Sequence, residues 1–296
     1  MEYNASEVRT RLDSLLETVI DDKETQKALS PDVDIPSQFL ETHGITLEFH
    51  EFDNTSNSAS KNIDLDPPIL FDYCSPNFFQ QHPVDLDAFT DPKWMKPTLH
   101  YAKFKKDMPL MSRVSYAAHY LHRWAGGGGL PRKGVLPGAL STCELRGLVS
   151  VTGRHALYAG LGFNNNVAHQ YNVWIFEYYS VDKRFGSNKP HLILLGEIRD
   201  VGHEGSILYG ELALLLTAMR NRAFQRAVFK YPDSDEDSEK GNEIPSDKGF
   251  RFEDERRFPV LMVSIVGMQH ARISHACMDG LKVTLVMLSP TYADEV

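Results

Sequence analysis

The sequence predicts an α/β protein with a mixed β-sheet and flanking helices, and three observations carry this prediction. Apolar and β-branched runs typical of strands fill residues 171–181, 191–201 and 258–288. A segment with helical periodicity at 206–224 separates two of these runs, which favours a right-handed crossover between parallel strands. The 296 residues are 42% hydrophobic and 24% charged, an ordinary composition for a chain with a packed core.

The first part of the chain mixes helical and irregular segments. Residues 4–20 place apolar side chains at helical spacing, and we expect an amphipathic helix capped by Ser6. Residues 45–52 alternate apolar and polar side chains, as a half-buried strand does. Residues 109–125 return to helical periodicity and stop at four glycines, which we interpret as a helix-ending linker.

The expected domain organisation follows from these segments. We expect residues 1–110 to form an N-terminal helical and irregular region packed on the core. Residues 111–296 are expected to form the α/β core domain. Within that core, Ser141 and Glu144 have capping-box spacing, so we expect a helix to open at 141–161.

The strands at 171–181 and 191–201 have the form of an antiparallel hairpin. A turn centred near Gly186 would place residue 197 opposite residue 175, and the alternation of side chains would then put Glu177 on the face of Glu197. Ser206 is positioned to cap the helix that follows the hairpin. Three more strands follow, and Asp279-Gly280 predicts a tight turn between the last two.

An acidic segment at 231–257 separates that helix from the last strands. It holds ten acidic and five basic residues, hence −5 of the formal charge of −9, which leaves −4 for the rest of the chain. We expect a flexible, solvated loop here. The acidic balance disfavours nucleic acid as a partner, but removing the loop from the count weakens that argument.

The cysteines and the hydropathy of the sequence predict the cellular location of the protein. Cys74, Cys143 and Cys277 are far apart and form no CxxC pair, which is typical of reduced thiols in a cytoplasmic protein. The sequence shows no secretory signal and no apolar stretch long enough for a membrane span. His270 and His275 are at odd spacing in one expected strand, so they face opposite sides and do not predict a zinc site.

The element order from residue 141 to residue 266 resembles the core of the PD-(D/E)XK nuclease superfamily. Glu197-Ile198-Arg199 resembles the Glu-x-Lys end of that family's third strand, with arginine in place of lysine. The resemblance implies an acid on the second strand and a glutamate on the third that hold Mg²⁺ and position water. Asn164, Asn165 and Asn166 occupy the region where the family has an aspartate. Arg199 departs further, because a guanidinium is always protonated and is a poor base.

A second resemblance covers residues 267–273. This segment reads Gly-Met-Gln-His-Ala-Arg-Ile and is similar to a Gly-x-Gln-His-x-Arg-Ile segment of uncharacterised proteins from filamentous fungi. It implies a lineage and, through that lineage, a context in fungal secondary metabolism.

Three functions are compatible with these features. The first is a cofactor-independent cyclase or isomerase acting on a small, apolar organic substrate. Its expected catalytic residues are Glu177, Glu197, Arg199 and His270, with proton transfer by Glu197 or His270 and Arg199 holding a carbonyl or carboxylate. Its expected substrate-binding residues are Trp174, Phe176, Tyr178 and Gln269.

The second function is a divergent Mg²⁺-dependent nuclease, in which Glu177 and Glu197 hold the metal and Arg199 holds the phosphate. This hypothesis expects a basic groove, for which the chain offers Arg146, Arg154, Lys183, Arg184, Arg220 and Arg222. The third is a non-catalytic interaction protein whose acidic loop contacts a partner.

Overall fold

The computed structural model describes residues 3–29, 34–52, 70–71, 77–78, 109–126, 143–148, 150–151, 153–155, 157–158, 171–178, 189–198, 200–228, 245–267 and 270–290. Its helices are α1 (Ala5–Leu16), the π-helix η1 (Glu17–Asp21), α2 (Lys23–Ala28), α3 (Ser37–Thr42), α5 (Leu110–Gly126) and α7 (Tyr209–Ala223). Its strands are β1 (Ile45–Phe52), β2 (Leu145–Leu148), β3 (Ser150–Val151), β4 (Leu157–Tyr158), β5 (Tyr171–Tyr178), β6 (Leu192–Ile198), β7 (Arg226–Val228), β8 (Pro245–Phe250), β9 (Val260–Val266), β10 (His270–Asp279) and β11 (Lys282–Pro290).

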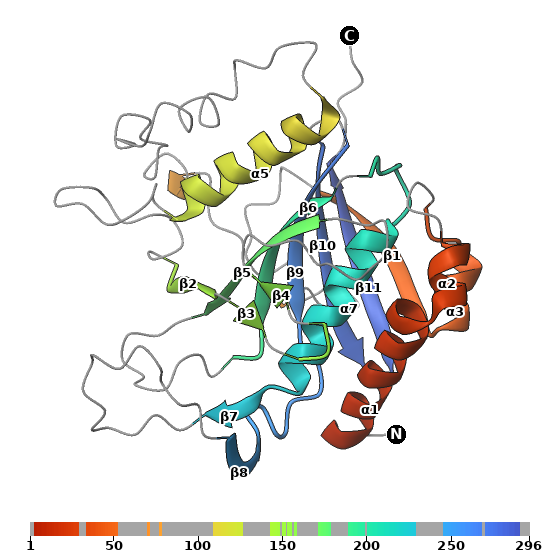
Figure 1. Cartoon of the computed structure of the whole chain (residues 1–296), viewed down its shortest axis with the longest axis vertical. Helices are drawn as coiled ribbons and strands as arrows, with labels where there is room; N and C mark the ends of the chain where they lie inside the picture. Colours follow the sequence, from red (N-terminus) through yellow and green to blue (C-terminus); the bar gives the residue numbers. More distant parts are fainter. Residues whose placement is uncertain are drawn as a thin grey trace, which may run out of the picture.

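A seven-stranded mixed sheet with helices on its faces forms the centre of the molecule, which confirms the predicted α/β class (Figure 1). Its strand order is β1-β11-β10-β9-β6-β5-β2. β2, β5 and β6 form an antiparallel meander, and β9 pairs with β6 in parallel. The parallel pair requires a crossover connection, and α7 lies within it. β10 and β11 follow as a hairpin, with Gly280 at a positive φ in the predicted turn.

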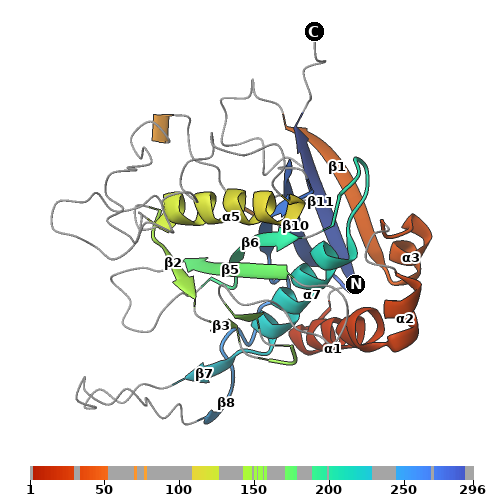
Figure 2. The same cartoon turned by 45° about the horizontal axis from the view of Figure 1, so that its top comes forward.

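The two long helices α5 and α7 cover opposite faces of the sheet (Figure 2). The apolar sequence of β6 allows this because both of its faces are buried. Gly196 faces α7, and a Cβ there would lie 3.3 Å from the side chain of Leu214. The alternate side chains of Leu195 and Glu197 therefore face α5.

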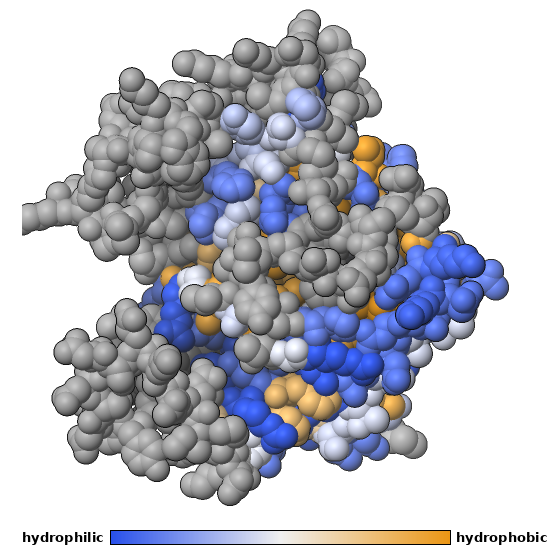
Figure 3. All heavy atoms as spheres, viewed as in Figure 1, coloured by the Kyte–Doolittle hydropathy of each residue, from blue (hydrophilic) through white to orange (hydrophobic). Residues whose placement is uncertain are grey.

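The N-terminal region is built onto this core. α1 packs against α7, and β1 pairs in parallel with β11 along the edge of the sheet. The strand expected at 45–52 is confirmed at those bounds. The outer surface over α2 and α3 is mainly hydrophilic (Figure 3).

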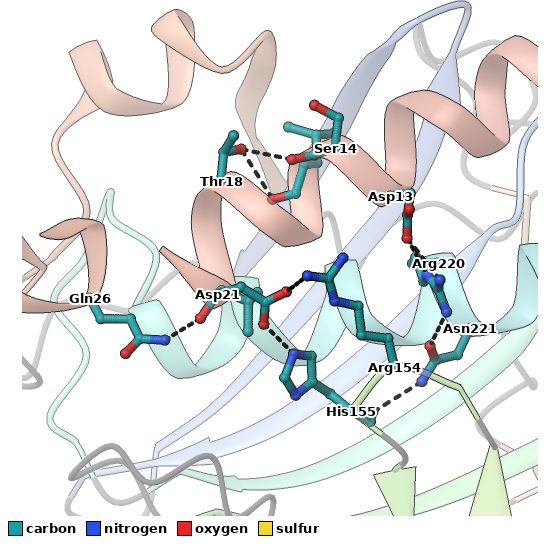
Figure 4. A network of polar contacts seen from close by, with 11 residues as sticks. Asp13, Ser14, Thr18, Asp21, Gln26, Arg154, His155, Arg220 and Asn221 are labelled. Atoms are coloured by element: carbon teal, nitrogen blue, oxygen red, sulfur yellow. Dashed lines mark hydrogen bonds and ion pairs between the residues drawn. The ribbon is translucent and has the colours of Figure 1, made fainter. Parts of the chain in front are cut away.

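Polar contacts hold the start of the chain to α7 and to the β3–β4 hairpin (Figure 4). Asp21, the last residue of η1, pairs with Arg154 Nη2 at 2.5 Å and with the His155 ring. The Asn221 side chain of α7 donates to the His155 carbonyl at 3.0 Å, while Arg220 pairs with Asp13 on α1. One network thus joins three elements that are remote in sequence.

Two expected helix caps are wrong. Asn4, rather than Ser6, caps α1, and its side chain and that of Glu7 bond each other's backbone N–H groups. α7 begins after Leu208, whose N–H donates to the Glu211 carboxylate at 3.0 Å. Ser206 instead donates to Asp34 at 2.6 Å, because the chain runs extended for two more residues before the helix starts.

The helix expected at 141–161 is also wrong. The described residues of this segment form a turn followed by β2, β3 and β4. Glu144 has a φ of 54°, outside the helical region, and so cannot complete a capping box. Gly147, a residue of low helix propensity, lies in β2 opposite Phe176, where a sheet partner overrides the capping-box spacing.

The acidic segment differs from the expected loop over its second half. Residues 245–250 form β8, which pairs with β7, and a turn follows over 251–254. Phe252 is buried in the main hydrophobic cluster, and Arg9 Nη2 of α1 donates to its carbonyl at 2.6 Å. The net charge of the segment gave no indication that Phe252 is buried. Residues 231–244 lie outside the described part of the chain.

Candidate functional site

Glu197 is a buried carboxylate near the end of β6, on the face covered by α5. Its exposed fraction is 1%. The Ser115 hydroxyl of α5 donates to Oε1, and Asn172 Nδ2 of β5 donates to Oε2 at 3.0 Å. Both oxygens therefore have partners, one from the helix above and one from the neighbouring strand. A buried polar group without a hydrogen bond costs about 1–3 kcal/mol of stability. The two donors therefore offset the cost of burying the Glu197 side chain.

The register of β5 and β6 creates this site. Asn172 is the direct antiparallel partner of Glu197. The expected partner was residue 175, so the hairpin is shifted by three positions. An odd shift moves a strand's side chains to the opposite face, and Glu177 consequently does not share the face of Glu197. The expected pairing of the two carboxylates on one metal is therefore wrong.

Glu177 belongs to an ion cluster at the far end of β5. Arg146 Nη2 lies 2.6 Å from Oε1, Arg222 Nη2 lies 3.0 Å from Oε2, and Arg251 Nη1 lies 3.9 Å from Oε2. Burial raises the pKa of Glu177, but the hydrogen bond from Arg146 and the charges of Arg222 and Arg251 outweigh it, so the net pKa is lowered. Glu177 is a structural counterion rather than part of the Glu197 site.

Of the remaining expected catalytic residues, the structure describes His270, and it does not lie beside Glu197. His270 is exposed at the start of β10 and pairs with Val266, which packs in the cluster under α7. Cross-strand partners share a face, so His270 lies on the side of the sheet opposite Glu197. Arg199 and Gln269 fall outside the described residues.

The aromatic side chains expected to bind substrate are packed instead. Trp174 and Phe176 face α5 and are 7% and 5% exposed, in a cluster with Val114, Ala117, Ala118 and other apolar residues. Tyr178 lies at the strand's end, where its hydroxyl donates to Glu144 at 2.5 Å. Trp174 and Phe176 therefore belong to the packing between β5 and α5.

Two histidines of α5 lie one and two turns beyond Ser115. The His119 ring bonds the Ser115 carbonyl through Nδ1 at 2.8 Å and meets Trp174 edge-on, with ring centroids 5.1 Å apart. His122 stacks on the same indole at 5.0 Å. α5 thus runs along β5 with Ser115 over Glu197 and His119 over the adjacent Trp174.

Sequence reasoning missed Ser115, His119 and Asn172 as site residues. Ser115 is 82 positions from Glu197, and the helical pattern of its segment gives no reason to select one hydroxyl. Asn172 could have been found from the hairpin alone, but only with the correct register. The sequence analysis instead assigned the three asparagines at 164–166 to the position of the family's aspartate, and these residues lie outside the described part of the chain.

The metal-binding capacity of the site follows from its donors. Within the described ranges, no group of three or more His, Cys, Asp or Glu residues is arranged to hold a metal ion. Glu197 and the side-chain oxygen of Asn172 are hard donors of the kind that Mg²⁺ prefers. Mg²⁺ keeps several waters and is commonly held by only one or two carboxylates together with substrate phosphates. In the structure both Glu197 oxygens accept hydrogen bonds, and Asn172 presents Nδ2 rather than its oxygen to the carboxylate, so a metal ion would have to displace these bonds.

A second buried carboxylate, Glu211 on α7, is fully occupied. Ser264 Oγ donates to Oε1, the Leu208 N–H donates to Oε2, and Arg272 Nη1 lies 3.3 Å from Oε2. Burial raises the pKa of Glu211 despite these partners. His203, in the turn before α7, pairs with Asp34 at 2.9 Å and does not join Glu211.

Comparison with family models, with curated proteins and with solved structures finds no match to this chain. In the part of the chain that the structure describes, no helix has the length and apolar character needed to cross a membrane.

Proposed function

We propose that this protein is a divergent, metal-dependent phosphodiesterase of the PD-(D/E)XK kind that acts on nucleic acid. The observation that carries the proposal is the juxtaposition of Glu197 and Asn172 on neighbouring strands under Ser115. The strand order supports it. α5 is followed by the antiparallel meander β2-β5-β6, then by α7 and by β9 parallel to β6. From the β5–β6 hairpin onward this is the order that the resemblance implies, whereas the helix expected at 141–161 is replaced by β2, β3 and β4.

In that frame, Glu197 occupies the position of the third-strand glutamate and Asn172 stands where the second strand has an acid. An amide oxygen lacks the carboxylate's charge, so we expect weaker metal binding than in a two-carboxylate site. A bound Mg²⁺ would stabilise negative charge on the phosphoryl oxygens and lower the pKa of a bound water.

The chain's own residues contribute positioning and charge. Ser115 fixes the orientation of the Glu197 carboxylate by its hydrogen bond, and Asn172 holds the second oxygen. The side chain of Arg199, two positions after Glu197 in the sequence, supplies a guanidinium that suits bidentate binding of a phosphate.

The organic-metabolite hypothesis requires Glu177, Glu197 and His270 to meet beside an aromatic pocket. Glu177 and His270 lie on the other face of the sheet, and α5 packs over Trp174 and Phe176. The nuclease hypothesis loses Glu177 as a metal ligand, and its expected groove arginines are paired with carboxylates: Arg146 and Arg222 with Glu177, Arg154 with Asp21 and Arg220 with Asp13. It keeps Glu197 beside Asn172, and we therefore prefer it.

Thermal unfolding with Mg²⁺ and Mn²⁺, beside cleavage of labelled single- and double-stranded DNA and RNA, tests the proposal. We expect a metal-dependent rise in Tm and metal-dependent cleavage in the wild type, because a ligand that binds only the folded state stabilises it. In Glu197→Gln both effects should disappear, with cleavage reduced at least about 100-fold.

Glu204→Gln is the matched control, since Glu204 is an exposed glutamate in the turn after β6. It should retain the metal-dependent Tm shift and the cleavage. Absence of metal binding and of cleavage in the wild type would overturn the proposal and return attention to a small organic ligand.

A further inference from the structure

The outer edge of β1 has no strand partner among the residues that the structure describes. β1 ends the strand order of the seven-stranded sheet and pairs with β11 on its inner side (Figure 1). The Val283 N–H of β11 donates to the Gly44 carbonyl at 3.1 Å, so the even-numbered residues of β1 direct their backbone groups toward β11. The N–H and C=O groups of Ile45, Leu47 and Phe49 therefore point outward, away from the sheet.

β1 lacks the features that protect exposed strand edges in natural proteins. Such edges commonly carry lysine, proline or a β-bulge, or are very short. The eight residues Ile-Thr-Leu-Glu-Phe-His-Glu-Phe contain neither lysine nor proline. Their pairing with β11 runs over the whole strand without a shift in register. A long, regular edge of this kind is a template for an additional strand.

A groove with a volume of about 400 Å³ follows the same edge. It is lined by Leu40 and Glu41 of α3, residues 44–47 and Phe49 of β1, and Lys282 of β11. Consecutive strand residues face opposite sides of a sheet, so a cavity lined by residues 44–47 runs along the edge of the strand rather than over one face. The Phe49 side chain is 45% exposed. The groove therefore presents accessible apolar surface beside the outward backbone groups.

The two faces of β1 differ in chemistry at this edge. Leu47 and Phe49 lie on the apolar face with Ile45, whereas Glu48 lies on the other face with the exposed Thr46. The charged residues of the strand, Glu48 and Glu51, are both acidic. Residues directly opposite on paired strands share a face, where opposite charges stabilise the pair and like charges destabilise it. A complementary strand therefore alternates apolar residues with basic ones.

We propose that the outer edge of β1 binds an extended peptide segment of a partner protein by strand addition, and that this segment alternates apolar residues with lysine or arginine. The backbone of the segment pairs with the outward groups of β1. Its apolar side chains lie against Leu47 and Phe49 in the groove beside α3, and a basic side chain lies opposite Glu48. The surface is separate from the Glu197 site, and the proposal does not rest on the proposed function.

Fluorescence anisotropy with a labelled peptide, Lys-Val-Lys-Leu-Lys-Phe-Lys-Val, tests the proposal on the full chain at about 0.15 M salt, where long-range attraction is screened. A second peptide, Lys-Lys-Val-Leu-Lys-Lys-Phe-Val, has the same composition without the alternation. A third has the first sequence with alternate backbone amides methylated, so that it cannot pair as a strand. We expect the alternating peptide to bind at least about tenfold more tightly than either control.

Variants locate the binding on β1. Phe49→Lys places a positive charge on the edge and removes apolar surface from the groove, and it should weaken binding of the alternating peptide at least about tenfold. Val201→Lys is the matched control, because Val201 is a large hydrophobic residue of similar exposure, 47%, in the turn after β6. It should bind the peptide as the wild type does. Leu47→Pro removes one outward N–H without removing a bond to β11 and should also weaken binding.

Circular dichroism and Tm identify variants that remain folded, and Phe49→Lys keeps the test decisive if Leu47→Pro does not fold. Equal binding of the alternating, rearranged and methylated peptides would overturn the proposal. Absence of binding, or unchanged binding in folded Phe49→Lys, would do the same. Sedimentation velocity examines a second copy of the chain as the occupant of the edge. A wild-type dimer that Phe49→Lys dissociates and the alternating peptide does not displace would overturn the assignment to a partner peptide.

Discussion

His275 is an imidazole that its surroundings keep uncharged. It is fully buried on β10, and neither ring nitrogen has a hydrogen-bond partner among the described residues. The ring of Phe71 meets it edge-on at 5.7 Å. Burial, assisted by the nearby charge of His191, lowers the pKa of His275 from 6.5 to about 4.

This residue makes stability depend on pH in a defined window. The unfolded state binds a proton at His275 near pH 6.5, whereas the folded state binds it only near pH 4. Protonation therefore favours unfolding as the pH falls between these values, and the loss reaches about 3 kcal/mol on an order-of-magnitude scale. Above pH 6.5 the contribution is constant.

His275→Leu should flatten the decrease in unfolding free energy between pH 6.5 and pH 4, measured by urea unfolding at a series of pH values. His270→Leu, an exposed position on the same strand, controls for the loss of an imidazole. An unchanged slope in His275→Leu would contradict the assignment of this pH dependence to His275.

At the scale of elements, the ion cluster around Glu177 joins β2, β5, α7 and the turn after β8. Arg222 is its central residue and is 1% exposed. Besides its pair with Glu177, Arg222 Nε donates to the Pro190 carbonyl at 3.2 Å, and Nη1 donates to Gln225 at 2.8 Å. Burial lowers the pKa of Arg222 to about 10, and the charge of Glu177 acts in the opposite direction.

A double-mutant cycle tests this cluster. Glu177→Leu should lower the unfolding free energy by about 3–5 kcal/mol, because it leaves the Arg222 guanidinium buried beside no carboxylate. Adding Arg222→Met to Glu177→Leu should recover part of that loss, with a coupling of at least about 1 kcal/mol in urea unfolding. Strictly additive effects would show that the two side chains do not stabilise each other.

Helices and strands were predicted correctly where the pattern of their own residues identifies them, and wrongly where pairing with a distant segment decides the structure. Alternation in 45–52 and the apolar runs of β6 and β9 identified strands, because a buried pleated surface selects those residues. The 141–161 segment misled, because its capping-box spacing is a local signal while its pairing with β5 is a long-range one. The β5–β6 register was inaccessible, since 13 residues separate the strands and no tight-turn signal fixes the centre.

The candidate site was predictable only in part for the same reason. Glu197 could be selected from the strand end and the motif alone. Its partners Ser115 and Asn172 come from another helix and from the strand register, neither of which is a local property. Glu177 was selected from an assumed hairpin register and His270 from its place just past an apolar strand, but the sheet places both on its other face.

At the scale of the molecule, the sheet is a continuous scaffold from β1 at one edge to β2 at the other. The N-terminal region contributes to it directly, since β1 is one of its strands and α1 packs on α7 (Figure 1). The Glu197 site lies where β5 and β6 meet α5, and the Glu177 cluster lies at the other end of β5. The two ends of β5 thus have different roles: Asn172 belongs to the Glu197 site, and Glu177 is a structural counterion.

We propose that Glu197 and Asn172 hold a metal ion weakly because Asn172 is an amide, and calorimetric titration with Mn²⁺ tests this proposal. Asn172→Asp adds a carboxylate beside Glu197 and should tighten binding at least about tenfold, equivalent to about 1.4 kcal/mol. Glu197→Gln should abolish binding, and the double variant, with one carboxylate, should return to weak binding. Equal affinities in the wild type and Asn172→Asp, or wild-type binding that survives Glu197→Gln, would contradict the account.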